Sequence, residues 1–289
     1  MTWVPSYNRD VSKSMIQSQF GGYGPSTGLS RIGLQWWSLT TNGDLRRVEE
    51  FGKINDEEIS FYTDWAKGND IKVLLCIYNG VKEWDWSLAK KGFIENKNNL
   101  IQQLVNEVDK YHLDGIDVDL EGLVPTNKKE RQKFKSFIKE LSLQLRKRGK
   151  LLTVDTFHSP LFNSPNLSWW EDWVGDIDGV HSMGYQDLFE GSTHTFNHVS
   201  GYLFRYSWQQ NYGLKLGYKP SQIFMGLPSD VNSWGSGGVG TTALNHIHEC
   251  INSGSSIAIW DIQLLGGKGQ HGWQSAEVWK TLTKFVEKE

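Results

Sequence analysis

The stretch from Leu113 to Gly122 reads LDGIDVDLEG, and its alternation of acidic and apolar residues decides how the rest of the chain is interpreted. In an extended strand, Asp117, Asp119 and Glu121 lie on one face, and the apolar residues that alternate with them lie on the other. Carboxyl groups two residues apart on a strand are roughly 6 to 7 Å apart and repel each other in a partly dry site. We therefore expect a coupled titration in which at least one of them keeps a proton near neutral pH, as a general acid requires.

Two other interpretations of this stretch are weaker. A calcium-binding loop needs glycine and polar residues between its acidic ligands, whereas apolar side chains stand between them here. A solvated edge strand would mix lysine or threonine with its acids. A sugar-binding barrel without catalytic activity is a third possibility, and it depends on the rest of the chain.

Length and composition favour one large soluble domain. The 289 residues, 38% of them apolar, suit a single domain spanning residues 1–289. A net charge of -3 gives no reason to expect nucleic acid or an anionic membrane as a partner, and no run of residues is long enough to span a membrane. We expect a monomer that acts outside the cell after loss of any leader peptide, with a cytoplasmic location left open.

The two cysteines do not point to a disulfide framework. Cys76 lies in the apolar run KVLLCIY, where a buried free thiol is expected. The 14 tryptophans, by contrast, exceed what a core of this size needs and suggest aromatic platforms of the kind that pack against sugar rings.

Short apolar runs alternate with helical patterns along the whole chain. Helical spacing is clear in Asn99–Tyr111 and Lys128–Arg148 and weakest around Val11–Phe20. The eight apolar runs are Thr2–Tyr7, Arg31–Trp37, Ile71–Tyr78, Gly115–Leu120, Leu151–Phe157, Asp178–Tyr185, Gln222–Leu227 and Ser256–Ile262. This repetition predicts an α/β fold of the (β/α)8 TIM-barrel type, with functional groups at the carboxyl ends of the strands.

Five of the predicted strands resemble those of glycoside hydrolase family 18, the chitinases and endo-β-N-acetylglucosaminidases. The family signature DGxDxDxE is complete from Asp114 to Glu121. KVLLCIYNG resembles the third strand of the family, HSMGYQD its Met-x-Tyr strand, IFMGLPSD its seventh strand, and AIWDIQL its eighth strand with the terminal tryptophan.

The resemblance implies retaining hydrolysis in which the substrate's own 2-acetamido oxygen is the nucleophile, an exception to the usual pair of protein carboxylates. Glu121 would protonate the glycosidic oxygen and later activate water, while Asp119, coupled to Asp117, would orient the acetamido group. Tyr185 would donate a hydrogen bond to that group, and Trp260 would form the floor under the sugar. No metal and no cofactor are implied.

The chain also departs from the family pattern. Gln186 and then Asp187 follow Tyr185, where many chitinases have aspartate at once, so the way Met183, Gln186 and Asp187 hold the sugar is open. The segment Ser229–Ser255 is too short for the extra α+β insertion of some chitinases, which predicts a shallow open groove and endo action. Other tryptophans after predicted strands are candidates for sugar subsites, about half of which we expect to be packing residues instead: Trp36, Trp37, Trp84, Trp86 and Trp234.

Chitin, or another oligosaccharide containing N-acetylglucosamine, is the expected partner. A chitinase is the first interpretation, an endo-β-N-acetylglucosaminidase acting on the chitobiose core of N-glycans is the second, and a non-hydrolytic lectin is the third. The presence of Glu121 disfavours the lectin, because an unused buried carboxyl group costs free energy.

Overall fold

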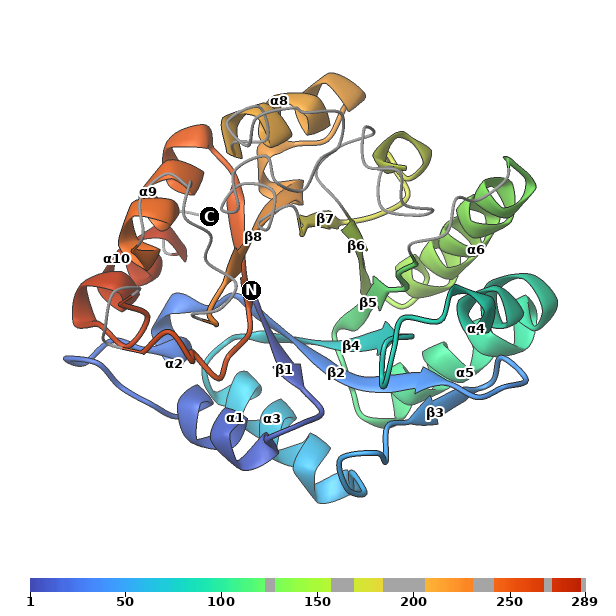
Figure 1. Cartoon of the computed structure of the whole chain (residues 1–289), viewed down its shortest axis with the longest axis horizontal. Helices are drawn as coiled ribbons and strands as arrows, with labels where there is room; N and C mark the ends of the chain where they lie inside the picture. The colour runs from blue at the N-terminus through green and yellow to red at the C-terminus, as the bar shows by residue number, and fades with distance from the viewer. Residues whose placement is uncertain (123–127, 157–168, 184–205, 231–241, 268–271, 287–289) are drawn as a thin grey trace.

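A computed structural model describes residues 1–122, 128–156, 169–183, 206–230, 242–267 and 272–286. In these residues the strands form one sheet in the order β1-β9-β8-β7-β6-β5-β4-β2-β3, and pairing of β1 with β2 closes it into a barrel (Figure 1). The barrel strands are parallel, and β3 is an antiparallel addition to β2. The (β/α)8 barrel predicted from the sequence is confirmed.

The strands are β1 (Thr2–Pro5), β2 (Arg31–Leu39), β3 (Leu45–Arg47), β4 (Lys72–Tyr78), β5 (Gly115–Asp119), β6 (Leu151–Thr156), β7 (Gly179–Ser182), β8 (Ile223–Pro228) and β9 (Ser256–Trp260). The α-helices are α1 (Arg9–Ile16), α2 (Pro25–Gly28), α3 (Asp56–Gly68), α4 (Trp86–Lys90), α5 (Lys97–Lys110), α6 (Lys128–Arg146), α8 (Tyr206–Leu216), α9 (Ala243–Ser253) and α10 (Ala276–Val286). Shorter helical turns are η1 (Lys91–Glu95), η2 (Trp170–Asp172) and η4 (Pro220–Gln222).

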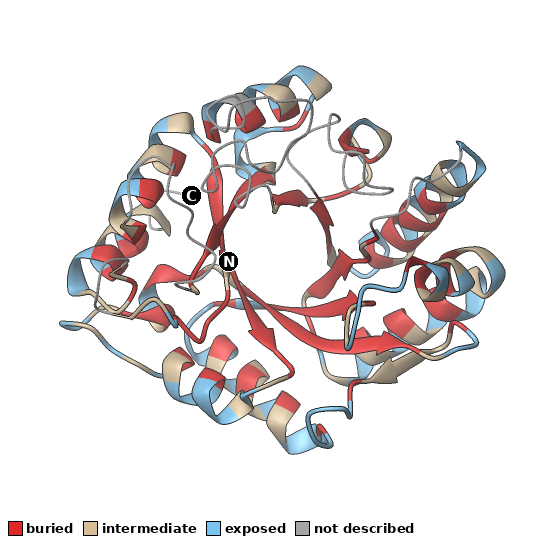
Figure 2. Cartoon of the chain, in the orientation of Figure 1, coloured by how far each residue is buried: buried red, intermediate tan, exposed pale blue. Residues whose placement is uncertain are grey.

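The helices surround the barrel and bury their apolar faces against it, while their outer faces are exposed (Figure 2). On β5 the prediction of alternating faces is confirmed, because Ile116 and Val118 pack in the core shared with the helices while Asp117 and Asp119 bond to side chains of other barrel strands. Gly115 begins this strand because a Cβ atom there would lie 2.2 Å from the carbonyl oxygen of Leu151 on β6. Close contact between β5 and β6 thus requires glycine.

The barrel interior has an apolar and a polar part. Its apolar cluster contains Trp3, Leu74, Cys76, Phe224 and Ala258. The polar side chains come from the adjacent strands β5, β6 and β7 and from β2, and all are buried: Gln35, Asp117, Asp119, Thr153, Asp155 and His181. Polar groups in such a place need partners within the protein, so they form the connected network described below.

Some details differ from the sequence-based expectation. The addition of β3 and the one-turn helix α2 were not predicted, and β7 ends at Ser182, earlier than expected. The described residues contain no second sheet, in agreement with the predicted lack of an α+β insertion. Within the same residues, no helix is long and apolar enough to cross a membrane.

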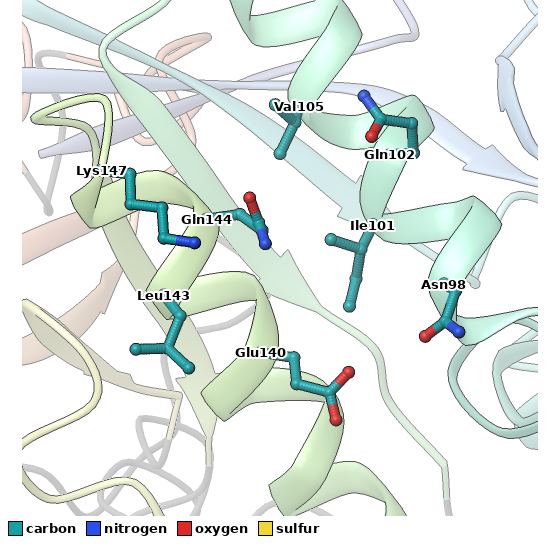
Figure 3. A pocket seen from close by; sticks show the side chains of 8 residues that line it. All are labelled: Asn98, Ile101, Gln102, Val105, Glu140, Leu143, Gln144 and Lys147. Carbon is teal, nitrogen blue, oxygen red and sulfur yellow. The ribbon is translucent and has the colours of Figure 1, made fainter.

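A hollow of about 360 Å³ lies on the outside of the barrel, between α5 and α6 (Figure 3). Ile101 and Val105 of α5 face Leu143 and Gln144 of α6 across it. It lies on the helical layer, away from the carboxyl ends of the strands where barrel enzymes place their catalytic groups.

Candidate active site

The carboxyl end of β5 carries the acidic residues, each in a different environment. Asp117 and Asp119 are 0% and 3% exposed, while Glu121 lies beyond the end of the strand and is partly exposed. The expectation that all three belong to one extended strand is therefore wrong for Glu121. Depth decreases from Asp117 to Glu121, so Glu121 is the acid that a substrate can reach.

Asp117 is held as a carboxylate. Its Oδ2 accepts a hydrogen bond from Trp3 Nε1 at 2.8 Å, and its Oδ1 accepts one from the hydroxyl of Thr153. His181 Nδ1 lies 3.1 Å from the same Oδ1. Burial opposes the charge, but the interactions with His181, Thr153 and Trp3 outweigh it and lower the pKa of Asp117 below its ordinary value.

Asp119 titrates much higher than Asp117. Burial and the charge of Asp117 raise its pKa to about 7, although hydrogen bonds with Glu121 and Gln35 act in the opposite direction. The Gln35 bond runs from Nε2 to Asp119 Oδ2 at 2.9 Å. Gln35 reaches Asp119 from β2, a contact that the sequence analysis missed.

Glu121 is positioned by its backbone. Its N–H donates to Asn79 Oδ1 at 2.7 Å, and its carbonyl oxygen accepts from Asn79 Nδ2, also at 2.7 Å. Asn79 directly follows β4 and is 2% exposed. Burial, followed by the charge and hydrogen bond of Asp119, raises the pKa of Glu121 well above its ordinary value. The raised pKa values of Asp119 and Glu121 favour a proton on this pair near neutral pH.

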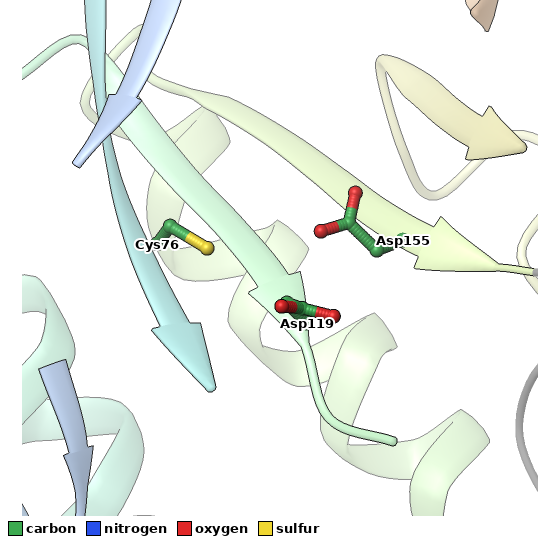
Figure 4. A group of neighbouring side chains, drawn as sticks. All are labelled: Cys76, Asp119 and Asp155. Atoms are coloured by element: carbon green, nitrogen blue, oxygen red, sulfur yellow. The ribbon is translucent and has the colours of Figure 1, made fainter. Parts of the chain in front are cut away.

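Two further acidic or nucleophilic groups stand beside this pair. Figure 4 shows Cys76 on β4 and Asp155 on β6 on either side of Asp119. Burial raises the pKa of both groups, and for Asp155 the charges of Asp117, Asp119 and Glu121 add to the effect. Cys76 is a buried free thiol, as predicted. Asp155 was missed, although its inward register on LLTVDT is visible in the sequence.

Two groups of side chains in this network bring polar atoms close together. Asp117, Asp155 and His181 place three possible ligand atoms within 4.8 Å of one another, as do Cys76, Asp119 and Asp155. His181 Nδ1 and Asp155 Oδ1, however, are 2.7 Å apart, a hydrogen-bond distance. The raised pKa values of Asp155 and Cys76 favour the protonated forms of both groups.

The wall opposite β5 is formed by β9 and the segment after it. Trp260 ends β9, is partly exposed, and meets Trp3 edge to face with ring centroids 5.8 Å apart. Asp261 accepts bonds on both oxygens, from Tyr7 Oη at 3.1 Å and from the Gln263 N–H at 2.8 Å. Burial raises the pKa of Asp261 to about 6. Tyr7 and Asp261 were not among the predicted site residues.

Two predicted sugar-binding tryptophans are instead packing residues. Trp36 is 0% and Trp37 1% exposed. A register shift between Gln35 and Trp37 turns both rings into the helical layer, where Trp36 Nε1 donates to the carbonyl of Pro5 and Trp37 Nε1 to Glu107. The prediction that Trp36 and Trp37 bind substrate is therefore wrong. Trp86 is also buried, against Phe93 and Phe134.

Trp84 and Met183 remain candidate site residues because both are at least partly exposed. Trp84 follows β4, is 43% exposed and packs over Gly80. Met183 follows β7 and is partly exposed. The remaining four lie outside the described residues: Tyr185, Gln186, Asp187 and Trp234.

A (β/α)8 barrel with adjacent carboxyl groups at the carboxyl end of a strand is an arrangement suited to glycoside hydrolysis. The profile of "Glycosyl hydrolases family 18" matches residues 25–284, and the chain belongs to that family. No curated protein matches the chain.

Solved structures share the fold at low sequence identity. A chitinase from Chromobacterium violaceum has 13% identity and a TM-score of 0.68, with 99% of this chain and 98% of that chain covered. A mutant of the class V chitinase from Nicotiana tobaccum, in complex with NAG4, has 14% identity and a TM-score of 0.68, with 98% and 97% covered. The spore cortex-lytic enzyme SleL of Bacillus cereus has 12% identity and a TM-score of 0.69, with 98% and 73% covered.

Proposed function

We propose that the protein is a chitinase, a retaining endo-hydrolase that cleaves β-1,4 bonds between N-acetylglucosamine units. The observation that carries the proposal is the position of Asp119 and Glu121 on one wall of the barrel, at the end of β5 and directly after it, where the pKa of both carboxyl groups is raised. A pair on one wall cannot flank a sugar from opposite faces as acid and nucleophile. A nucleophile within the substrate removes that requirement.

In this mechanism Glu121 donates its proton to the glycosidic oxygen as the bond to the anomeric carbon breaks. The 2-acetamido oxygen of the same sugar bonds to that carbon and forms an oxazolinium ion. Asp119, ionised, accepts the acetamido N–H and stabilises the positive charge. Glu121 then takes a proton from water, which attacks the anomeric carbon and restores the sugar with its original configuration.

The opposite wall supports this assignment. Asp261 is the carboxyl group that β9 places across the barrel from β5, and hydrogen bonds from Tyr7 and Gln263 occupy its two oxygens. Asp261 is also only 6% exposed. It is therefore poorly suited to attack a sugar. In the proposal, Trp260 forms the floor below the sugar and Tyr185 donates to the acetamido oxygen.

A set of four substrates tests the proposal. Chitin tetramer and hexamer, a fully deacetylated hexamer and a high-mannose glycoprotein are incubated separately with the enzyme. We expect cleavage of the two chitin oligomers, with the β-anomer appearing first by NMR, and no cleavage of the deacetylated hexamer, which lacks the acetamido oxygen. Release of glycan without cleavage of chitin oligomers would instead select the endo-β-N-acetylglucosaminidase. Equal cleavage of the deacetylated hexamer would contradict the mechanism.

A further inference from the structure

His181 and Asp155 form a buried pair that the proposed mechanism does not use. They are 0% and 1% exposed and lie on β7 and β6, deeper in the barrel than Glu121. Neither side chain can touch a substrate. Both nevertheless contact Asp117, the carboxylate whose charge raises the pKa of Asp119.

The surroundings of the His181 ring identify its protonation state. Nδ1 lies 2.7 Å from Asp155 Oδ1 and 3.1 Å from Asp117 Oδ1, so this nitrogen carries the proton that both oxygens can accept. Among the described residues Nε2 has no hydrogen-bond partner. The rings of Trp3 and Phe224 pack nearly perpendicular to the His181 ring, with their centroids 5.3 and 4.9 Å from its centroid. A second proton, on Nε2, would be buried without an acceptor, so the ring is neutral.

Positive groups near the ring oppose a further charge. The Arg31 guanidinium lies 4.5 Å from the centroid of the Phe224 ring, and both it and the amino group of Met1 act on His181. Burial is the main cause that lowers the pKa of His181, against the effect of Asp117.

For Asp155 it is a negative charge that the surroundings oppose, because negative groups surround this residue. Asp117, Asp119 and Glu121 face it from β5 and the segment after it, and the Cys76 thiol faces it from β4. A protonated Asp155 relieves this repulsion. It can accept from His181 on Oδ1 and hydrogen-bond to Asp117 with its own proton.

We propose that His181 and Asp155 are positioning residues that keep Asp117 ionised, the neutral imidazole by donating its Nδ1 proton and the protonated carboxyl group by donating its own. The charge of Asp117 then holds the catalytic proton on the Asp119–Glu121 pair. This inference rests on the proposed function for its kinetic consequences, but not for the protonation states themselves.

Two variants of His181 separate positioning from packing. His181→Asn keeps a side-chain N–H near the position of Nδ1 but loses the ring, whereas His181→Phe keeps a ring and loses the donor. Without the N–H donor of residue 181, Asp117 takes up a proton and becomes neutral. The pKa of Asp119 then falls, because the negative charge of Asp117 no longer raises it. The acidic limb of the kcat/KM profile therefore moves to lower pH by about one unit. We expect that shift for His181→Phe and a limb within about 0.3 unit of wild type for His181→Asn. If His181 only packs, His181→Asn should shift the acidic limb of kcat/KM more than His181→Phe does. Equal shifts of the acidic limb in the two variants would overturn the proposal.

Asp155→Asn tests whether Asp155 is protonated. The amide reproduces a neutral acid, since its oxygen accepts from His181 and its N–H donates to Asp117. We expect kcat/KM within about threefold of wild type and an unchanged acidic limb, while Asp155→Leu, which cannot make either bond, moves the limb as His181→Phe does. An acidic limb shifted to lower pH by Asp155→Asn would show that Asp155 is ionised in the wild-type enzyme and would overturn the proposal.

Nitrogen-15 NMR of the imidazole rings gives a readout that needs no substrate. With the signal assigned by its loss in His181→Asn, we expect the neutral tautomer with the proton on Nδ1 and no titration between pH 5 and 8. An imidazolium at pH 6, or a proton on Nε2, would overturn the inference. If the wild-type enzyme fails to cleave chitin oligomers, the proposed function fails, but the NMR result still decides the state of this pair.

Discussion

At the scale of single residues, Asp117, Asp119 and Glu121 of LDGIDVDLEG differ because their partners differ. Asp117 receives bonds from Trp3 and Thr153, which favour its ionised form, whereas the pKa values of Asp119 and the partly exposed Glu121 are raised. The alternation of residues along the strand does not distinguish the environments of these three carboxyl groups. Side chains from other strands give each carboxyl group its own pKa.

Asp119 makes stability depend on pH, and its removal should stabilise the fold. Its pKa is about 7 in the folded chain and about 3.9 in an unfolded one. Because the folded state binds more protons in between, stability falls as pH rises from about 4 to 7. We expect Asp119→Asn to raise the free energy of unfolding at pH 8 by an amount on the order of a few kcal/mol, and by less at pH 5.

Thermal unfolding of both proteins at pH 5 and pH 8 measures this difference. Glu50→Gln is a matched control, because Glu50 is a surface carboxyl whose pKa is lowered to about 2 by Arg46. It should not gain stability at pH 8. A gain for Asp119→Asn of equal size at both pH values would exclude a raised pKa as its cause.

A variant of Asp261 distinguishes two possible nucleophiles, the acetamido oxygen of the substrate and the carboxylate of Asp261. If the substrate's acetamido oxygen attacks, Asp261→Asn should lower kcat by about tenfold or less, through loss of the Tyr7 contact, since one hydrogen bond contributes about 1 kcal/mol. Asp119→Asn should lower it by about 10² or more. Steady-state kinetics on chitin hexamer measures both values, and a larger loss for Asp261→Asn would mean that Asp261 takes part in bond formation.

At the scale of elements, the alternation within a strand was predictable, but contacts between strands were not. The strand predicted at Gly115–Leu120 is observed at Gly115–Asp119 with its acids on one face, because successive side chains of a strand point to opposite faces. The same rule failed at Trp37, since a register shift in β2 turns this side chain outward. Gln35, Asn79 and His181 reach the acids only when the barrel closes and brings together segments far apart in the sequence.

The hydrogen bonds between Asn79, which follows β4, and the backbone of Glu121 should control the position of Glu121. Asn79→Ala removes both hydrogen bonds to the Glu121 backbone, so we expect kcat on chitin hexamer to fall by about tenfold or more while KM changes little. Asn79→Asp retains the acceptor for the Glu121 N–H and should lose less. Equal losses for the two variants would show that the bond to the Glu121 N–H has no part in positioning.

At the scale of the whole molecule, some aromatic side chains are exposed and others are buried in the core. Trp84 is exposed after β4, whereas Trp36 is fully buried behind β2. We expect Trp84→Ala to raise KM for chitin hexamer by about three- to tenfold with little change in melting temperature. Trp36→Phe should lower the melting temperature and leave KM unchanged. An unchanged KM for Trp84→Ala would remove Trp84 from the groove.

The sequence pattern of the whole chain predicted the class of fold, but not the details of the mouth of the barrel. The repeated apolar runs were sufficient for the barrel, since each barrel strand needs only a buried outward face. The mouth is built from loops, whose conformations depend on contacts with one another rather than on a repeating pattern. The choice between chitin and N-glycan therefore could not be predicted from the strands.

The most direct test of the central claim is hydrolysis of chitin hexamer by wild-type enzyme and by Glu121→Gln from pH 4 to 9. We predict a bell-shaped profile for wild type, because activity requires an ionised Asp119 and a protonated Glu121. The amide cannot donate a proton, so kcat should fall by about 10²- to 10⁴-fold in a variant that unfolds at a similar temperature. A Glu121→Gln variant as active as wild type would contradict the account.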